Sequence, residues 1–154
     1  MPHIHEKIDY AADVLVVNND AVLLRMHEKY NMWLAPGGHV ELDEDFVEAA
    51  LREAKEETGL EVKLIGQITD TEDELGRELL IPRFINRHRV SPTHEHISFI
   101  YFGTSDTREL NPAEGESTEG MKWFTREELS DAQYGVSRRI QNYAKAALDA
   151  AGAE

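Results

Sequence analysis

Three glutamates stand at helical spacing near the middle of the chain, at positions 53, 56 and 57. In a helix with about 3.6 residues per turn, Glu53, Glu56 and Glu57 fall in one arc of about 100°. Carboxylates at this spacing repel one another, and a hard cation that prefers oxygen ligands would offset the repulsion. Magnesium is the common choice in proteins, with Mn²⁺ as an acceptable substitute. Such a cation can hold phosphates and activate water, although an acidic helix face taken alone is more often a solvated surface.

The residues around these glutamates predict the helix that would position them. It should run from about Asp45 to Thr58, with Asp45 as N-cap and Glu48 completing a capping box. Gly59 is placed to end the helix as its C-cap. A separate apolar stripe would face the core; it comprises Val47, Ala50, Leu51, Ala54 and Thr58.

Short apolar runs on both sides of this helix predict strands. Tyr10–Val17 and Ala21–Met26 flank a polar turn and indicate a hairpin, and Pro36-Gly37-Gly38 must also be a turn. Further strands are predicted at 62–68, 79–90, 96–104 and 121–124, with Pro82 disturbing the second, and a final helix at 136–150. An acidic loop, 111–120, precedes the last strand, and Thr125 should cap a short helix after it. This order predicts an α/β fold, a mixed sheet covered by helices.

Bulk properties limit the classes of function. The 154 residues suit a single domain over residues 1–154, and the absence of cysteine excludes thiol catalysis, cysteine metal sites and disulfides. The first ten residues lack a signal-peptide pattern and no apolar run is long enough to span a bilayer, so we expect a cytoplasmic protein without membrane contact. The net charge of −14 disfavours DNA as a partner, whereas a divalent cation can bridge an acidic protein to a small phosphate compound.

Residues 38–60, GHVELDEDFVEAALREAKEETGL, resemble the Nudix box, Gx5Ex7REUxEExGU, in which U is a bulky aliphatic residue. Every fixed position of the box is matched, by Gly38, Glu44, Arg52, Glu53, Glu56, Glu57 and Gly59. Leu60 fits the last aliphatic position, whereas Ala54 is smaller than the residue usually found at the first. We therefore expect the chemistry to be retained and the packing at Ala54 to be looser.

The resemblance extends from about residue 10 to residue 129. The family often carries W-x-x-P-G-G-x-x-E before the box and a W-F and an E-L near the end. The corresponding residues here are Trp33, Pro36, Gly37, Gly38, Glu41, Trp123, Phe124, Glu128 and Leu129. The resemblance implies the Nudix α/β/α sandwich, a mixed β-sheet flanked by helices.

The resemblance also implies roles for individual residues. Glu53, Glu56 and Glu57, with Gly37 beside them, would form the magnesium site. Arg52 would orient the neighbouring carboxylates, and Glu44 would lie near the metal or support the loop. Gly37 and Gly38 would let the backbone approach the helix start closely.

The resemblance implies that water attacks phosphorus and that a glutamate accepts the proton, but it leaves the identity of that base open. The family places the base either in the box or in a later loop. The candidate in the box is Glu53. The later candidates are Glu95, Glu114, Glu116 and Glu119, each of which is individually more often a surface charge; among these four, Glu119 is preferred because its loop often lies near the metals in this family.

Residues for substrate binding are less sharply marked. Arg83, Arg87 and Arg89 alternate along a predicted strand and could meet substrate phosphates, or could equally balance nearby acids. Tyr30 could stack on a base, as could Trp33 and Phe99, for which core packing is the better interpretation. The histidines at positions 88, 94 and 96 suggest a metal cluster, but without ligand spacing they are predicted to be loop and strand-end residues.

The sequence thus predicts a magnesium-dependent Nudix hydrolase, a pyrophosphatase that cleaves a diphosphate linkage in a small nucleotide-like substrate. The default substrate is a nucleoside triphosphate, including an oxidised one, because signatures for coenzyme A, NADH and ADP-ribose are absent. A non-catalytic nucleotide-binding domain of the same family is the alternative, although such domains usually have a broken box. The isoprenoid isomerases on this fold depend on a cysteine, which this chain lacks. A nucleic-acid-binding module is disfavoured by the charge, although enzymes that act on RNA 5′ ends occur in the family. The oligomeric state stays open, with a homodimer among the arrangements allowed.

Overall fold

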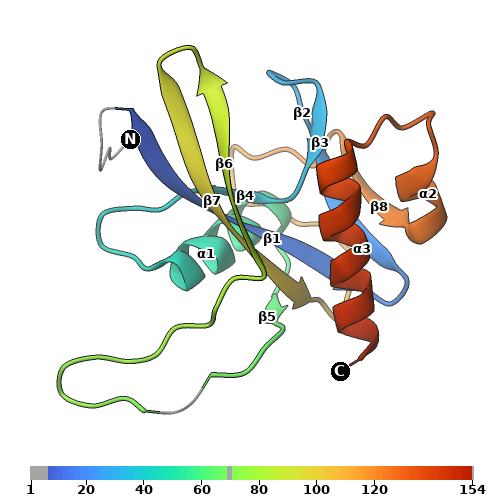
Figure 1. Cartoon of the computed structure of the whole chain (residues 1–154). Helices are drawn as coiled ribbons and strands as arrows, with labels where there is room; N and C mark the ends of the chain where they lie inside the picture. Colours follow the sequence, from blue (N-terminus) through green and yellow to red (C-terminus); the bar gives the residue numbers. More distant parts are fainter. Residues whose placement is uncertain (1–6, 69–70, 154) are drawn as a thin grey trace.

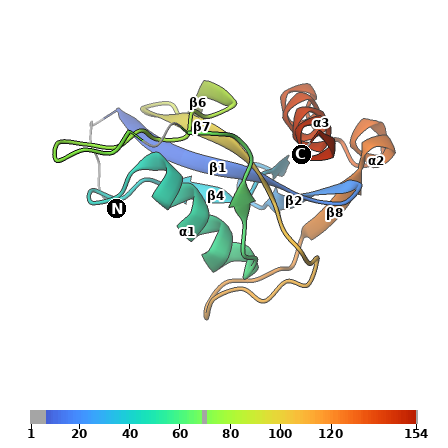
Figure 2. The same ribbon diagram turned by 90° about the horizontal axis from the view of Figure 1, so that it is seen from below.

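The computed structural model describes residues 7–68 and 71–153, and it confirms the predicted architecture of a mixed sheet flanked by helices. In Figure 2 the sheet is seen nearly edge-on, with α1 on one side and α2 and α3 on the other. The elements are β1 (Ile8–Asn18), β2 (Ala21–His27), β3 (Met32–Leu34), β4 (Gly37–His39), α1 (Phe46–Thr58), β5 (Lys63–Leu64), β6 (Phe84–Ser91), β7 (His94–Thr104), β8 (Met121–Thr125), α2 (Arg126–Ser130) and α3 (Arg138–Gly152).

Strand β1 lies at the centre of the sheet (Figure 1). It runs parallel to β7 along its length, from the pair Ile8–Glu95 to the pair Val17–Thr104. On its other edge, β4 pairs antiparallel with residues 11–13 and β2 pairs with the last two residues. β6 extends the sheet beyond β7, and β8 pairs with β2. Strands β2, β4 and β7 thereby all pair with β1.

The side chains of β1 alternate between two cores, as the pleat of a strand requires. Leu15 and Val17 pack in the core that α3 covers, with Ile140 and Tyr143 from that helix. The residues of β1 at positions 12, 14 and 16 pack in the core that α1 covers, which includes Ala50 and Ala54. The small Ala54 is fully buried in this second core.

The predicted start and end of α1 are confirmed. The carboxylate of Asp45 accepts hydrogen bonds from the backbone N–H groups of Val47 and Glu48, and the Glu48 side chain accepts from the N–H of Asp45, which completes the capping box. Gly59 ends the helix at φ 76°, in the left-handed region that favours glycine. The predicted hairpin is also confirmed, with Val17 opposite Val22.

The predicted strands at 62–68 and 79–90 are longer than the observed ones. β5 contains only residues 63 and 64, since Gly66 turns the chain at φ 139°. β6 begins at Phe84, after Pro82, which has no N–H to donate to a neighbouring strand. The chain between β5 and β6 makes a long excursion from the sheet (Figure 1), in which the apolar side chains of Leu75 and Ile81 are 98% and 80% exposed.

The two helices of the C-terminal part, α2 and α3, each begin directly after a residue whose side chain caps them. α3 begins at Arg138 rather than 136, because Ser137 takes the N-cap position and its hydroxyl accepts the N–H of Ile140. The short helix after Thr125 is present and is capped by that residue as predicted.

Within residues 7–68 and 71–153, no helix combines the length and the apolar character needed to cross a membrane.

Candidate active site

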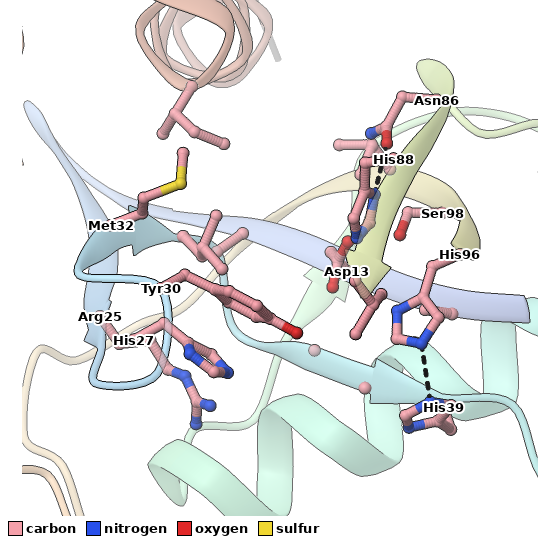
Figure 3. A pocket seen from close by; sticks show the side chains of 18 of the residues that line it. Asp13, Arg25, His27, Tyr30, Met32, His39, Asn86, His88, His96 and Ser98 are labelled. Carbon is pink, nitrogen blue, oxygen red and sulfur yellow. Dashed lines mark hydrogen bonds between the residues drawn. The ribbon is translucent and has the colours of Figure 1, made fainter. Parts of the chain in front are cut away.

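A cavity of about 750 Å³ lies over the centre of the sheet, between the box glutamates and α3. Its floor comes from β1 and β7, and its walls come from β2, β3, β4, β6 and α3. Glu53 and Glu57 reach its lining from α1, which packs against the opposite face of the sheet. Figure 3 shows the side chains of Asp13, Arg25 and Tyr30 around this cavity. The volume is in the range that suits a nucleotide-sized ligand.

Two glycines of β4 let carboxylates from α1 and β1 line the cavity. A Cβ on Gly38 would lie 2.5 Å from the carboxyl carbon of Glu53, and a Cβ on Gly37 would lie 2.1 Å from Oδ1 of Asp13. Such separations are shorter than any van der Waals contact, so a side chain at either position would displace an acid. The absence of side chains here leaves a cradle of carboxylate oxygens.

Arg52 holds the acids of the box in place. Its guanidinium donates to Glu44 at 2.5 and 3.1 Å, to Oε1 of Glu53 at 2.8 Å and to Oε2 of Glu56 at 3.1 Å. It also donates to the backbone oxygen of His39 at 3.0 Å, which ties α1 to β4. A guanidinium has five donors in a fixed planar fork, so it can hold three carboxylates and a carbonyl at once, whereas a lysine ammonium has only three donors. This geometry agrees with the orienting role that the resemblance implies.

Glu57 is buried, at 6% exposure, and both of its oxygens are held. Arg25 donates to Oε1 at 2.5 Å, and the backbone N–H of Gly37 donates to Oε2 at 3.1 Å. Burial raises the pKa of Glu57 to about 7, and the negative charges of Glu53 and Glu116 act in the same direction, while Arg25 and the Gly37 hydrogen bond lower it. The carboxylate is thus rigidly placed but costly to ionise.

Asp13 is a site residue that the sequence analysis missed. It lies on β1 directly opposite Gly37, on the floor of the cavity (Figure 3). Burial raises the pKa of Asp13 to about 7, reinforced by the charges of Glu57 and Glu53 and opposed by a hydrogen bond from Ser98 and the charge of Arg25. Its signal in the sequence is a single acid inside an apolar strand, a position where an ionisable group is uncommon unless it has a function.

The acids around Gly37 and Gly38 form a donor set that fits a hard divalent cation. Burial raises the pKa of Glu53, and the charges of Glu56 and Glu44 add to this effect against the influence of Arg52. Burial is the main cause of the raised pKa values of Asp13, Glu53 and Glu57, and the crowding of neighbouring negative charges adds to it. A cation with oxygen ligands would relieve this crowding, and Mg²⁺ and Mn²⁺ are suited to such ligands. The side chain of Glu56 is more open, at 47% exposure.

The later candidates for a general base lie in different surroundings relative to Glu53, Glu56 and Glu57, which together form the glutamate centre. Glu116 and Glu119 both line a smaller cavity beside Arg25, and the charge of Glu116 contributes to the raised pKa of Glu57. Glu95 pairs with Arg87 on the exposed side of β6 and β7. Glu114 is exposed in the same acidic loop. Glu116 therefore acts on the glutamate centre electrostatically, a link that the sequence analysis did not single out.

The three arginines proposed for substrate binding are separated by the structure. Arg89 lines the cavity, whereas Arg87 is engaged by Glu95. Arg83 precedes β6, and its guanidinium lies over the ring of Phe102, 5.6 Å from the centroid. The predicted common strand face is therefore wrong for Arg83, because Pro82 delays the start of the strand.

Of the three aromatic residues considered for stacking, Tyr30 lines the cavity. Its ring stacks on His27 with centroids 4.5 Å apart (Figure 3). Phe99 stacks on Phe46 at 3.8 Å in the core that α1 covers, and Trp33 packs on Phe124 at 4.8 Å. Core packing, the preferred interpretation for Trp33 and Phe99, agrees with these contacts.

Two of the three histidines that the sequence analysis considered as a metal cluster, His94 and His96, gather with a third, His39, beside the cavity. His94 and His96 of β7 lie with His39 of β4 and Asp9 of β1, and each offers one ligand atom within 4.8 Å of all the others. His88 stands next to His96 but hydrogen bonds Asn86 at 2.9 Å (Figure 3). The prediction of loop and strand-end positions is wrong for His88 and His96, which lie within strands.

Known proteins resemble this chain over most of its length. A family model of the NUDIX domain matches residues 7–145. The chain belongs to the Nudix family. A crystal structure of a Nudix-family hydrolase from Clostridium perfringens is 35% identical and superposes with a TM-score of 0.79, covering 92% of this chain and 96% of that one.

Two curated Nudix relatives have more specific names. A probable DHNTP pyrophosphohydrolase of Lactococcus lactis is 32% identical over 111 residues, which are 72% of this chain and 63% of that protein. An m7GpppN-mRNA hydrolase of Xenopus laevis is 35% identical over 109 residues, 66% of this chain and 35% of that protein. The chain thus spans less than two thirds of the length of either relative.

Proposed function

We propose that this Nudix protein is a magnesium-dependent pyrophosphohydrolase that cleaves a diphosphate linkage in a small nucleotide-like compound. The observation that carries the proposal is the convergence of Glu53 and Glu57 beneath Gly37 and Gly38, at the edge of a cavity large enough for a nucleotide. The intact family box supplies these residues in one helix. The relatives named as pyrophosphohydrolase and mRNA hydrolase support hydrolysis of a phosphate compound.

The cation would be held by Glu53, Glu56 and Glu57, with Gly37 providing backbone beside them. When bound, it neutralises phosphate oxygens and lowers the pKa of a coordinated water. Arg52 keeps Glu53 and Glu56 turned toward the same point. Arg25 and the Gly37 N–H fix Glu57 so that little reorganisation is needed when substrate enters.

Glu53 is the residue we assign as proton acceptor. Both oxygens of Glu57 accept hydrogen bonds, from Arg25 and Gly37. Among the described residues Glu53 accepts only from Arg52, at Oε1, so its carboxylate can contact both the cation and a water. Burial raises the pKa of Glu53, which makes it a better base near neutral pH. Glu116 and Glu119, across Arg25, are the alternatives if the water is held from the loop side.

The remaining cavity would hold the nucleoside portion. Tyr30, stacked on His27, offers an aromatic face, and the cations of Lys29, Arg89 and Arg139 line the same space. Aromatic faces bind bases and positive side chains bind phosphates. The proposed substrate is a nucleoside triphosphate, with DHNTP and m7GpppN-mRNA as the compounds that the relatives' names add.

A panel of nucleoside di- and triphosphates, oxidised triphosphates, DHNTP, dinucleotide polyphosphates and cap analogues, assayed with Mg²⁺ in ¹⁸O water, tests the proposal. Water should attack phosphorus, so ¹⁸O should appear in a phosphate-containing product. Label confined to a sugar hydroxyl would end the proposal. Tight nucleotide binding without turnover across the panel would favour the alternative, a non-catalytic nucleotide-binding domain.

A further inference from the structure

The register of three strands places Asp9, His39, His94 and His96 on one face of the sheet. Asp9 and His96 are direct partners across β1 and β7, so their side chains point the same way. His94 is two residues before His96 and therefore shares that face. His39 pairs with Ala11, which is two residues after Asp9, so it lies on the same face as well. The gathering is thus dictated by strand pairing.

The distances between the ligand atoms fit one metal ion at their centre. Nε2 of His39 lies 3.1 Å from Nε2 of His96 and 3.9 Å from Oδ2 of Asp9, and Nε2 of His94 lies 3.1 Å from Oδ2 of Asp9. A tetrahedral site with bonds of about 2.1 Å has ligand atoms about 3.4 Å apart. The distances between the ligand atoms scatter around this value, and all pairs are within 4.8 Å.

The chemistry of the group differs from that of the glutamate centre. Three imidazoles and one carboxylate suit a borderline ion such as Zn²⁺, whereas the box acids offer oxygen alone. Each of the three histidines offers one ring nitrogen as a ligand atom, and Asp9 offers one carboxylate oxygen.

We propose that Asp9, His39, His94 and His96 bind a zinc-type divalent transition metal where β4 passes from Gly38, the neighbour of Glu53, to His39. Four protein ligands leave no open tetrahedral position, which is the arrangement of structural rather than catalytic zinc. The ion would join β1, β4 and β7 where β4 carries the glycines of the glutamate centre. This site goes beyond the proposed hydrolysis and does not depend on it.

Zinc binding to the full chain is measured in excess Mg²⁺ after dialysis against chelator, by metal analysis and by titration calorimetry. The wild type should hold one equivalent of Zn²⁺, and Co²⁺ in its place should give the intense visible absorption of a tetrahedral site. His96→Asn and Asp9→Asn should each lose at least tenfold in Zn²⁺ affinity. Zn²⁺ should also raise the melting temperature of the wild type by several degrees and of these variants much less.

Matched controls decide whether the four residues are the ligands. His88→Gln changes a neighbouring histidine that hydrogen bonds Asn86, and it should keep full zinc affinity. Glu57→Gln should also keep it. His3 and His5 lie outside the described residues, so a variant that lacks both is measured in parallel and should still bind.

Three results would overturn the zinc site. They are unchanged zinc affinity in His96→Asn and Asp9→Asn, equal loss in His88→Gln, or loss in the variant without His3 and His5. Melting of each variant in chelator shows that it is folded, so a loss of zinc binding in a folded variant supports the assignment.

Discussion

The two clusters of candidate metal ligands along β4 offer different atoms and are built in different ways. In the first cluster, Glu53 and Glu57 come from consecutive turns of a single helix and offer oxygen. In the second, His39 and His96 come from strands far apart in the chain and offer nitrogen. Helical spacing alone aligns the first set, whereas the second exists only after β1 has paired with both β4 and β7.

If both proposed sites bind metal, one cavity holds a site for a hard cation and, beside it, a site for a zinc-type ion. Hard cations such as Mg²⁺ favour carboxylates, and imidazole favours zinc-like ions. β4 links the two clusters, because Gly38 borders Glu53 and the next residue, His39, lies among the histidines. Variants of the glutamates should therefore change turnover with Mg²⁺ and spare Zn²⁺ affinity, and variants of the histidine group should change Zn²⁺ affinity.

The largest effect is expected for Glu57→Gln. It removes a carboxylate charge from the glutamate centre, and turnover with Mg²⁺ should fall roughly a thousandfold or more. Glu61→Gln is the matched control, since Glu61 is exposed and pairs with Lys55, and its turnover should equal that of the wild type. Steady-state kinetics on the best substrate of the panel measures both. Comparable turnover of wild type and Glu57→Gln would remove Glu57 from the site.

Gly38→Ala should lower turnover by about a hundredfold, because its Cβ would displace the carboxylate of Glu53. Gly76→Ala is the control, since a Cβ there meets nothing within 4 Å. Circular dichroism checks the fold, and kinetics gives the loss. An active Gly38→Ala enzyme would show that the position of Glu53 is not critical.

Arg52→Lys keeps the charge but loses the fork that holds three carboxylates, so turnover should fall about 10- to 100-fold with weaker apparent affinity for Mg²⁺. Arg77→Lys, on an exposed pair with Asp45, provides the comparison and should have no effect. Measuring the rate as a function of Mg²⁺ concentration distinguishes Arg52→Lys from Arg77→Lys. If the two lysine variants behave alike, Arg52 has no orienting role.

The smallest effect concerns stability. The folded pKa of Asp13 is raised from 3.8 to about 7, so its ionisation destabilises the fold as pH rises from about 4 to 7, and the penalty is complete above pH 7. In chelator, Asp13→Asn should therefore melt several degrees above wild type at pH 8, since each pKa unit corresponds to about 1.4 kcal/mol. The gain should shrink at pH 5. A pH-independent difference would contradict this origin.

The helix with the box could be predicted from sequence because its determinants are local. Asp45, Glu48 and Gly59 act within a few residues of the helix ends, and the glutamates follow its period. Asp13 and the histidine group could not be predicted, since their neighbours are set by pairing between distant strands. The long segment before β6 was also not predicted, because apolar residues such as Ile81 form a strand only where a partner strand is available to pair with them.

Anomalous scattering from crystals soaked in Mn²⁺ tests the central claim most directly, because it locates the hard cation without reference to substrate. The account predicts a manganese peak among the carboxylates of Glu53, Glu56 and Glu57 that is lost in Glu57→Gln crystals. A peak confined to the histidines, or an unchanged peak in the variant, would contradict the claim that these glutamates hold the catalytic cation.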